Sequence, residues 1–240
     1  MKDARRFARF ARRICDEYVA LGGRGAVGGV RFLYGPASSL NYPNGVVLLG
    51  INPGGEEDLS DRLSTAQTGY YSEIWTDGDY RSRVCNFMEK CFSLAGIVNW
   101  KAAWDRCVTS NLIPFRSTSL SKLTSQAHCV TFGRQLWGDI FAEIEPRAII
   151  AFGGEPRRSV LKILGETGAN PRLLRRYEAR SPAGLFAFDC VHGEGRALLI
   201  PHYAYGHGVR LPNEIQQMAS DLAPYLKPGI TQVGKIALQH

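Results

Sequence analysis

The residue best placed to do chemistry in this chain is Asn52, in the loop Gly50-Ile51-Asn52-Pro53-Gly54. The four apolar residues before this loop, Val46 to Leu49, are typical of a strand buried on both faces of a parallel sheet. Pro53 ends the strand because it has no N–H to donate to the ladder. Ligands of open α/β sheets bind beyond the carboxyl ends of the strands, so Asn52 presents an amide where a site is expected. Taken alone, these residues also fit an ordinary Asn-Pro-Gly turn.

A second amide, Asn111, stands near the end of another predicted strand, Arg106 to Leu112. An Asn side chain offers one acceptor and two donors. It can therefore accept from the ring N–H and donate to the neighbouring carbonyl of a base such as uracil. It disfavours cytosine, which carries an amino group at that position. A capping or turn Asn is the alternative interpretation.

The third candidate is His202, which follows a predicted strand ending at Ile200 and opens a loop rich in Gly and Tyr. Loops that a rigid scaffold presents at strand ends often carry function. A lone histidine in a protein is otherwise more often structural.

The first of these stretches carries a family resemblance. Gly50-Ile51-Asn52-Pro53-Gly54, followed by Ala66-Gln67-Thr68-Gly69, resembles the first motif of the uracil-DNA glycosylase superfamily. The nearest branches are the mismatch-specific uracil/thymine glycosylases and the single-strand-selective monofunctional glycosylases. The spacer from Gly55 to Thr65 is longer than in those branches and is acidic. The resemblance covers roughly Val46 to Leu226 as ordered motifs.

The resemblance implies a role for each candidate. Asn52 would orient the attacking water, Asn111 would bind the flipped base, with Ile51 beside it, and His202 would stabilise negative charge on the departing base. Because Asn52 carries no charge, slower turnover is expected than in branches with Asp there. No Lys occupies a matching position, so no lyase step is implied, and the reaction needs neither a metal nor a cofactor.

Two parts of the family pattern differ here. The nearest branches have a Phe three residues after Thr-Gly, where this chain has Ser72; Tyr70 or Tyr71 could supply the stacking ring, and Tyr71 is favoured. Tyr residues replace common prolines after His202. The family inserts a side chain from this loop into the gap left by the flipped nucleotide, and four residues are candidates: Tyr203, Tyr205, His207 and Arg210.

DNA binding also needs phosphate contacts. Arg116 and Ser117 follow Asn111, and Gly154 and Arg157 open a predicted helix whose N–H groups suit an anion. The formal net charge of +7 and the pI of about 9.2 favour a polyanionic partner without proving one. We expect DNA containing a damaged or deaminated base as the partner.

Composition sets the remaining limits. The chain has 240 residues, 45% of them apolar, which predicts one domain with a full core. Its six cysteines include no Cys-x-x-Cys pair, so buried thiols are favoured over a metal or iron–sulfur site. No membrane span or signal peptide is evident. We expect a cytoplasmic monomer, nucleoid-associated if the protein is bacterial.

Strands alternating with helices predict a three-layer α/β/α sandwich with a short, mostly parallel central sheet. Within one domain, 1–240, residues 1–45 form a basic helix, Lys2 to Leu21, and a connector; 46–226 form the core, and 227–240 a tail. The remaining predicted elements follow in chain order: helices Arg81 to Ala95 and Ser121 to Ile144, strand Ala148 to Phe152, helix Pro156 to Leu164, paired strands Gly184 to Val191 and Arg196 to Ile200, and helix Pro212 to Leu226.

The sequence therefore predicts a monofunctional DNA glycosylase that hydrolyses the N-glycosidic bond of uracil or a related deaminated base and so initiates base excision repair. Two alternatives stay open. One is a catalytically inactive relative that binds nucleic acid, and the other is a nucleotide or nucleoside hydrolase.

Overall fold

A six-stranded sheet with the order β2-β1-β3-β6-β5-β4 lies at the centre of the structure. The computed structural model describes residues 2–23, 28–54, 62–73, 78–178, 183–191, 193–201 and 212–226. Four strands run parallel: β1 (Val46–Gly50), β2 (Val108–Asn111), β3 (Ala148–Phe152) and β6 (Gly193–Ile200). Two more extend the sheet antiparallel: β5 (Ala183–Cys190) and β4 (Arg172–Tyr177).

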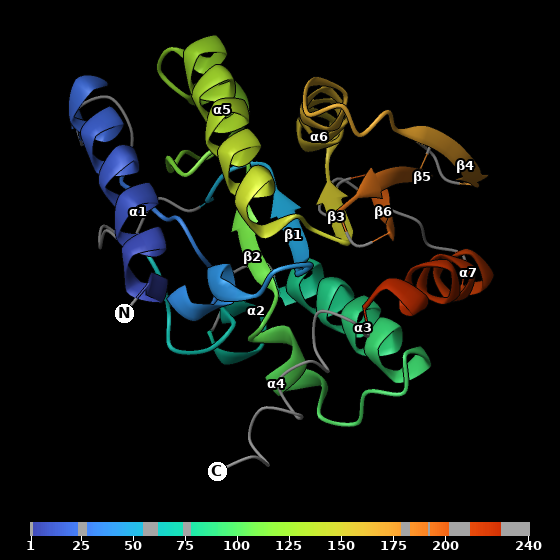
Figure 1. The fold of residues 1–240 in the computed structure, drawn as a ribbon. Helices are drawn as coiled ribbons and strands as arrows, with labels where there is room; N and C mark the ends of the chain where they lie inside the picture. Colours follow the sequence, from blue (N-terminus) through green and yellow to red (C-terminus); the bar gives the residue numbers. More distant parts are fainter. Residues whose placement is uncertain are drawn as a thin grey trace.

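Helices cover both faces of this sheet (Figure 1). One face packs against α1 (Lys2–Ala20), α5 (Gln126–Ile144) and α6 (Gly154–Glu166). The other packs against α2 (Gly69–Ser72), α3 (Gly78–Leu94), α4 (Trp100–Trp104) and α7 (Pro212–Leu222). Three short 3-10 helices complete the described elements: η2 (Ala37–Asn41), η3 (Leu120–Lys122) and η5 (Ala223–Tyr225). The predicted three-layer α/β/α architecture is confirmed.

The alternation of side chains along each strand divides the core in two. In β1, Val47 and Leu49 belong to the cluster under α1 and α5, whereas Val46 and Leu48 belong to the cluster under α3 and α7. All five residues of β1 and of β3 are buried, as expected for strands covered on both faces. This alternation fixes which face each site residue points to.

The four parallel strands end in register. Gly50 pairs with Asn111, Leu49 with Ala151, and Phe152 with Ile200. The chain therefore leaves β1, β2, β3 and β6 along one edge of the sheet. Neighbouring exits are joined by main-chain hydrogen bonds, from Leu112 N to Gly50 O at 2.9 Å and from Gly153 N to Ile200 O at 2.9 Å.

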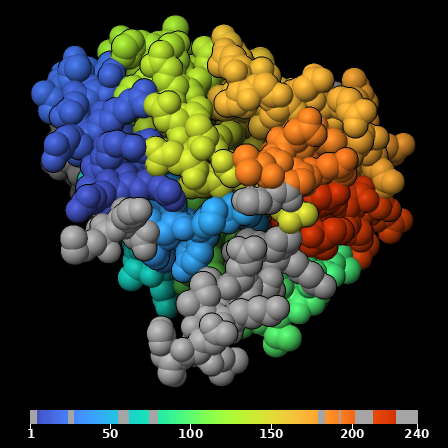
Figure 2. Space-filling view, in the orientation of Figure 1, coloured from blue at the N-terminus to red at the C-terminus, as the bar shows by residue number. Residues whose placement is uncertain are grey.

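The N-terminal helix packs as predicted, with Phe10, Ala11 and Ile14 buried. Its basic face does more than meet solvent, because arginines of α1 pair with carboxylates of α5, which lies beside it on the surface (Figure 2). These ion pairs join Arg6 and Arg9 to Glu143, and Arg13 to Asp139.

The segment predicted to be a connector is instead part of the core. Val30, Phe32 and Leu33 are buried, and Leu33 bridges Ser110 of β2 in antiparallel fashion. This segment covers the β2 edge of the sheet. Its role is hard to recognise in the sequence, because glycines and prolines surround the apolar residues.

The edge strand β4 was not predicted, although its Arg172, Arg175 and Arg176 are exposed, as expected. The turn between β5 and β6 is tighter than predicted, since β6 already begins at Gly193. Gly195 lies within that strand, where a Cβ would come within 2.4 Å of the Phe188 ring.

Candidate functional site

Asn52 lies two residues beyond β1 and is half-buried, with its amide held in one direction. Its Nδ2 donates to Pro53 O at 3.2 Å, to Ser117 O at 3.2 Å and to Ser117 Oγ at 3.0 Å. Two of these partners are carbonyl oxygens, which can only accept, so the NH₂ group must face them. The amide oxygen Oδ1 therefore points elsewhere, and no described residue donates to it.

Ser117 fixes this orientation from both its side chain and its main chain. Its Oγ donates to Ser119 O at 2.6 Å, so the hydroxyl has its lone pairs left to accept from Asn52. Its N–H donates to Pro53 O at 3.1 Å and so joins the exits of β1 and β2. The sequence assigned Ser117 to DNA phosphate, but the structure places its hydroxyl on Asn52.

Asn111 is the last residue of β2 and is 7% exposed. Its Oδ1 lies over Gly50, where a Cβ would come within 2.2 Å of it. The bare Cα of Gly50 is therefore what lets the Asn111 amide lie across the end of β1. The main chain of Asn111 is also fixed, because its carbonyl accepts from Trp137 Nε1 at 3.0 Å.

Tyr34 is a site neighbour that the sequence did not indicate, since it lies in the predicted connector. It is 8% exposed, and its N–H donates to Thr109 O of β2 at 2.8 Å. Burial raises the pKa of Tyr34, against the opposing effects of Arg31 and of a hydrogen bond from the Asn111 side chain. Its hydroxyl therefore stays protonated at neutral pH beside Asn111.

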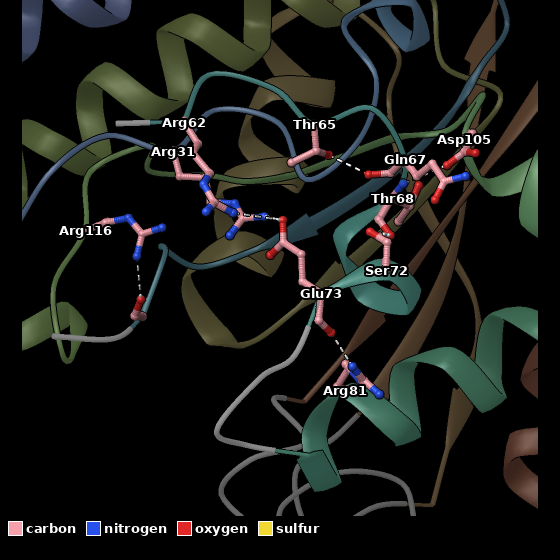
Figure 3. Close-up of polar contacts among 11 residues, drawn as sticks. Arg31, Arg62, Thr65, Gln67, Thr68, Ser72, Glu73, Arg81, Asp105 and Arg116 are labelled. Carbon is pink, nitrogen blue, oxygen red and sulfur yellow. Dashed lines mark hydrogen bonds and ion pairs between the residues drawn. The ribbon is translucent and has the colours of Figure 1, made fainter. Parts of the chain in front are cut away.

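Next to the Thr-Gly motif, Arg31 and Glu73 form an ion pair (Figure 3). The Arg31 guanidinium of this pair lies over the Tyr34 ring. Arg31 Nη2 lies 2.5 Å from Glu73 Oε1, and Arg62 Nη1 lies 3.7 Å from the same oxygen. A Cβ on Gly69 would come within 2.9 Å of Glu73 Cδ and 3.0 Å of Arg31 Nη2. The glycine of this motif thus makes room for a partly buried ion pair.

The two tyrosines predicted to stack on a base belong to an aromatic cluster on the α3 and α7 face of the sheet. Tyr70 is 4% exposed and stacks on Trp104, with ring centroids 5.6 Å apart. Tyr71 packs against Trp100 and Trp104 of α4, the helix that precedes β2, whereas Asn111 ends that strand. Burial and a hydrogen bond to Asp105 raise the pKa of Tyr71. The Tyr70 ring also lies 6.0 Å from the ring of Tyr34, the neighbour of Asn111. A base contact for either tyrosine stays a prediction.

Ile51 and Arg116 hold the main chain of the site. The Ile51 carbonyl accepts from Ile113 N at 2.9 Å, which ties it to the exit of β2. Arg116, predicted to contact DNA, is only 4% exposed, and its Nη1 lies 3.4 Å from Gly54 O. It is therefore placed to support the loop after β1 rather than to meet phosphate at the surface.

The start of α6 fits a phosphate contact better than Arg116 and Ser117 do. Gly153 has a φ of 102°, in the region that favours glycine, and Gly154 is exposed, with open space where a Cβ would project. Arg157 is half-buried in the first turn, and its Nε has no hydrogen-bond partner among the described residues. Burial, then Arg158, lowers the pKa of Arg157.

The remaining predicted residues lie outside the described part of the chain: His202, Tyr203, Tyr205, His207 and Arg210. The structure reaches the residue before them, Pro201, which is buried directly after β6.

Within the described ranges, no cluster of three or more His, Cys, Asp or Glu side chains could hold a metal ion. The described helices also include none with the length and apolar character needed to cross a membrane. Comparison of the sequence with protein-family models and with curated proteins found no match.

Proposed function

We propose that the protein is a monofunctional DNA glycosylase that removes uracil or a related deaminated base by hydrolysis. The observation that carries this proposal is the orientation of Asn52. Its NH₂ group is committed to the carbonyls of Pro53 and Ser117, so its Oδ1 is directed to accept a hydrogen bond. A water held by that oxygen would be oriented for attack on the sugar carbon.

Asn111 supplies the second requirement, a group that binds the leaving base. It ends the strand beside β1 and pairs in register with Gly50, two residues before Asn52. An amide at this position is complementary to a base edge with a carbonyl next to a ring N–H. Breaking the glycosidic bond puts negative charge on the base, and donors preset toward that charge lower the barrier.

DNA is the partner that the charge and the start of α6 favour. The excess of 29 basic over 22 acidic residues suits a polyanion, although it does not identify one. Gly154 and the Arg157 guanidinium lie at the start of α6, after the exit of β3 and next to the exit of β1 that carries Asn52. We assign them to a phosphate of the bound strand.

The test is alkaline cleavage of end-labelled oligonucleotides that contain uracil, hypoxanthine or xanthine, either single-stranded or mismatched. The wild type should produce a strand break at the modified base. Asn52→Ala and Asn111→Ala should each slow excision by about 100-fold or more, the usual scale for losing a group that acts in the transition state. His202→Ala should do the same if the loop after β6 keeps the family role.

Asn86→Ala is the matched control, because Asn86 is exposed on α3 and its replacement favours the helix. If no lesion is cleaved while DNA is bound and released by salt, a binding module replaces the enzyme. Hydrolysis of free nucleotides or nucleosides, with no excision from DNA, would instead support the nucleoside hydrolase.

A further inference from the structure

We propose that Tyr34 is a positioning residue for Asn111, and that it sets the edge of the base that the site accepts. The inference rests on the proposed glycosylase function, which it extends from the reaction to the choice of base. It concerns a residue before β1, outside every motif that the sequence indicated.

The backbone places Tyr34 on the same face of the sheet as Asn111. The segment around Leu33 runs antiparallel to β2, and Tyr34 N–H donates to Thr109 O at 2.8 Å. Leu33 belongs to the core under α1 and α5, whereas Tyr34 belongs to the core under α3 and α7. Thr109 accepts from Trp104 in that second core, so Asn111, two residues further along the strand, points to the same side.

The two polar groups are buried together. Asn111 and Tyr34 are 7% and 8% exposed, and buried polar groups are nearly always hydrogen-bonded. Burial, the largest effect, raises the pKa of Tyr34, whereas Arg31 and then a hydrogen bond with the Asn111 side chain lower it. The phenol is therefore neutral. Asn111 Oδ1 lies over Gly50 of β1, whereas the Tyr34 segment lies on the opposite side of β2, so we assign the NH₂ end of the Asn111 amide to the Tyr34 hydroxyl.

The Tyr34 ring is held on several sides. Arg31 Cζ lies 3.8 Å from the ring centroid, and Glu73 holds that guanidinium through the 2.5 Å ion pair. The main-chain oxygen of Tyr34 accepts from Gly69 N at 2.6 Å. These contacts fix the position of the Tyr34 hydroxyl, so it can orient the Asn111 amide.

An Asn amide has two ends of nearly the same shape, and only its partners decide which end faces a ligand. With one N–H on Tyr34, Asn111 retains one N–H and the lone pairs of Oδ1. Those groups complement bases with a carbonyl beside a ring N–H, as in uracil, hypoxanthine and xanthine. Bases with an amino group beside an unprotonated ring nitrogen need the reverse arrangement.

Tyr34→Phe tests this inference, because it keeps the ring and removes the hydroxyl. Tyr80→Phe is the matched control: Tyr80 is another buried tyrosine of the same aromatic cluster, with its ring centroid 6.4 Å from that of Tyr70. The first readout is the side-chain amide NMR signal of Asn111, assigned by its loss in Asn111→Ala. The second is the single-turnover rate of base excision.

We expect Tyr34→Phe to shift the Asn111 amide signal and to slow excision by at least about tenfold, since small displacements in a site cost one to two orders of magnitude in rate. Tyr80→Phe should leave that signal in place and change the rate less than about twofold, because it removes a buried hydroxyl of the same cluster to which we assign no contact with Asn111. An amide signal and rate that respond equally to both variants would overturn the inference. If the wild type excises no base yet Tyr34→Phe alone moves the amide signal, the proposed function fails and the positioning of Asn111 stands.

Discussion

The environment of Asn52 explains why an amide rather than a carboxylate suits this position. Two carbonyl oxygens and a hydroxyl oxygen that accepts surround its Nδ2. A carboxylate there would bring its negative charge against acceptors and leave them without a donor, which is costly in a partly buried site. The chain thus combines an uncharged side chain with a surrounding shell that fixes its direction.

Gly50 gives the sharpest prediction about a single residue of the site. A Cβ at this position would come within 2.2 Å of Asn111 Oδ1, the far end of a side chain that can move aside. We expect Gly50→Ala to slow excision by about 100-fold, because it displaces the Asn111 amide, which we propose binds the base. The free energy of unfolding, measured by urea denaturation, should change by less than about 1 kcal/mol.

Gly165→Ala is the control for this variant, since no atom lies within 4 Å of its Cβ position in α6. If Gly50→Ala excised the base at the wild-type rate, the Asn111 amide would not have to lie across the end of β1.

Among the elements, those built from continuous apolar runs could be predicted from sequence. β1 and β3 are short, apolar and bounded by glycine, and their exits were placed correctly. β4 could not be predicted, because five of its six residues are exposed at the edge of the sheet and show no alternation. Tyr34 was missed because its position depends on pairing with β2, a contact remote in sequence.

Gly133 in α5 is a second residue whose role depends on a contact remote in sequence. From sequence it only weakens the helix, yet a Cβ there would come within 2.4 Å of the Leu112 carbonyl, directly after Asn111. We expect Gly133→Ala to lower the free energy of unfolding by about 1–3 kcal/mol, because backbone atoms would have to move.

Gly138→Ala in the same helix is the matched control, with no atom within 4 Å of its Cβ position. It should instead stabilise the protein, by up to about 1 kcal/mol. Equal effects of the two substitutions in urea denaturation would show that α5 does not pack closely on the exit of β2.

For the whole molecule, buried phenols and thiols predict loss of stability at alkaline pH. Burial raises the pKa of Tyr34 and Tyr70, and also of Cys91 and Cys107. Unfolded thiols titrate near pH ~8.5 and phenols near pH ~10. Above these values the unfolded chain releases protons that the folded protein keeps, so the free energy of unfolding falls as pH rises.

Urea denaturation between pH 7 and about 10.5 checks this expectation. The midpoint should hold steady from neutral pH to about pH 8 and then decline, more steeply above pH ~10. A midpoint that does not change up to pH ~10.5 would contradict the burial of these groups.

The proposed function depends on hydrolysis of a base from DNA by a site built at the exits of β1 and β2. Mass spectrometry can follow this reaction directly in oligonucleotides containing uracil, hypoxanthine or xanthine that are incubated with the protein. We expect a free base and an oligonucleotide with an intact abasic sugar, and both products should be lost in Asn52→Ala. Unchanged oligonucleotides, or equal product from Asn52→Ala, would contradict the proposed hydrolysis.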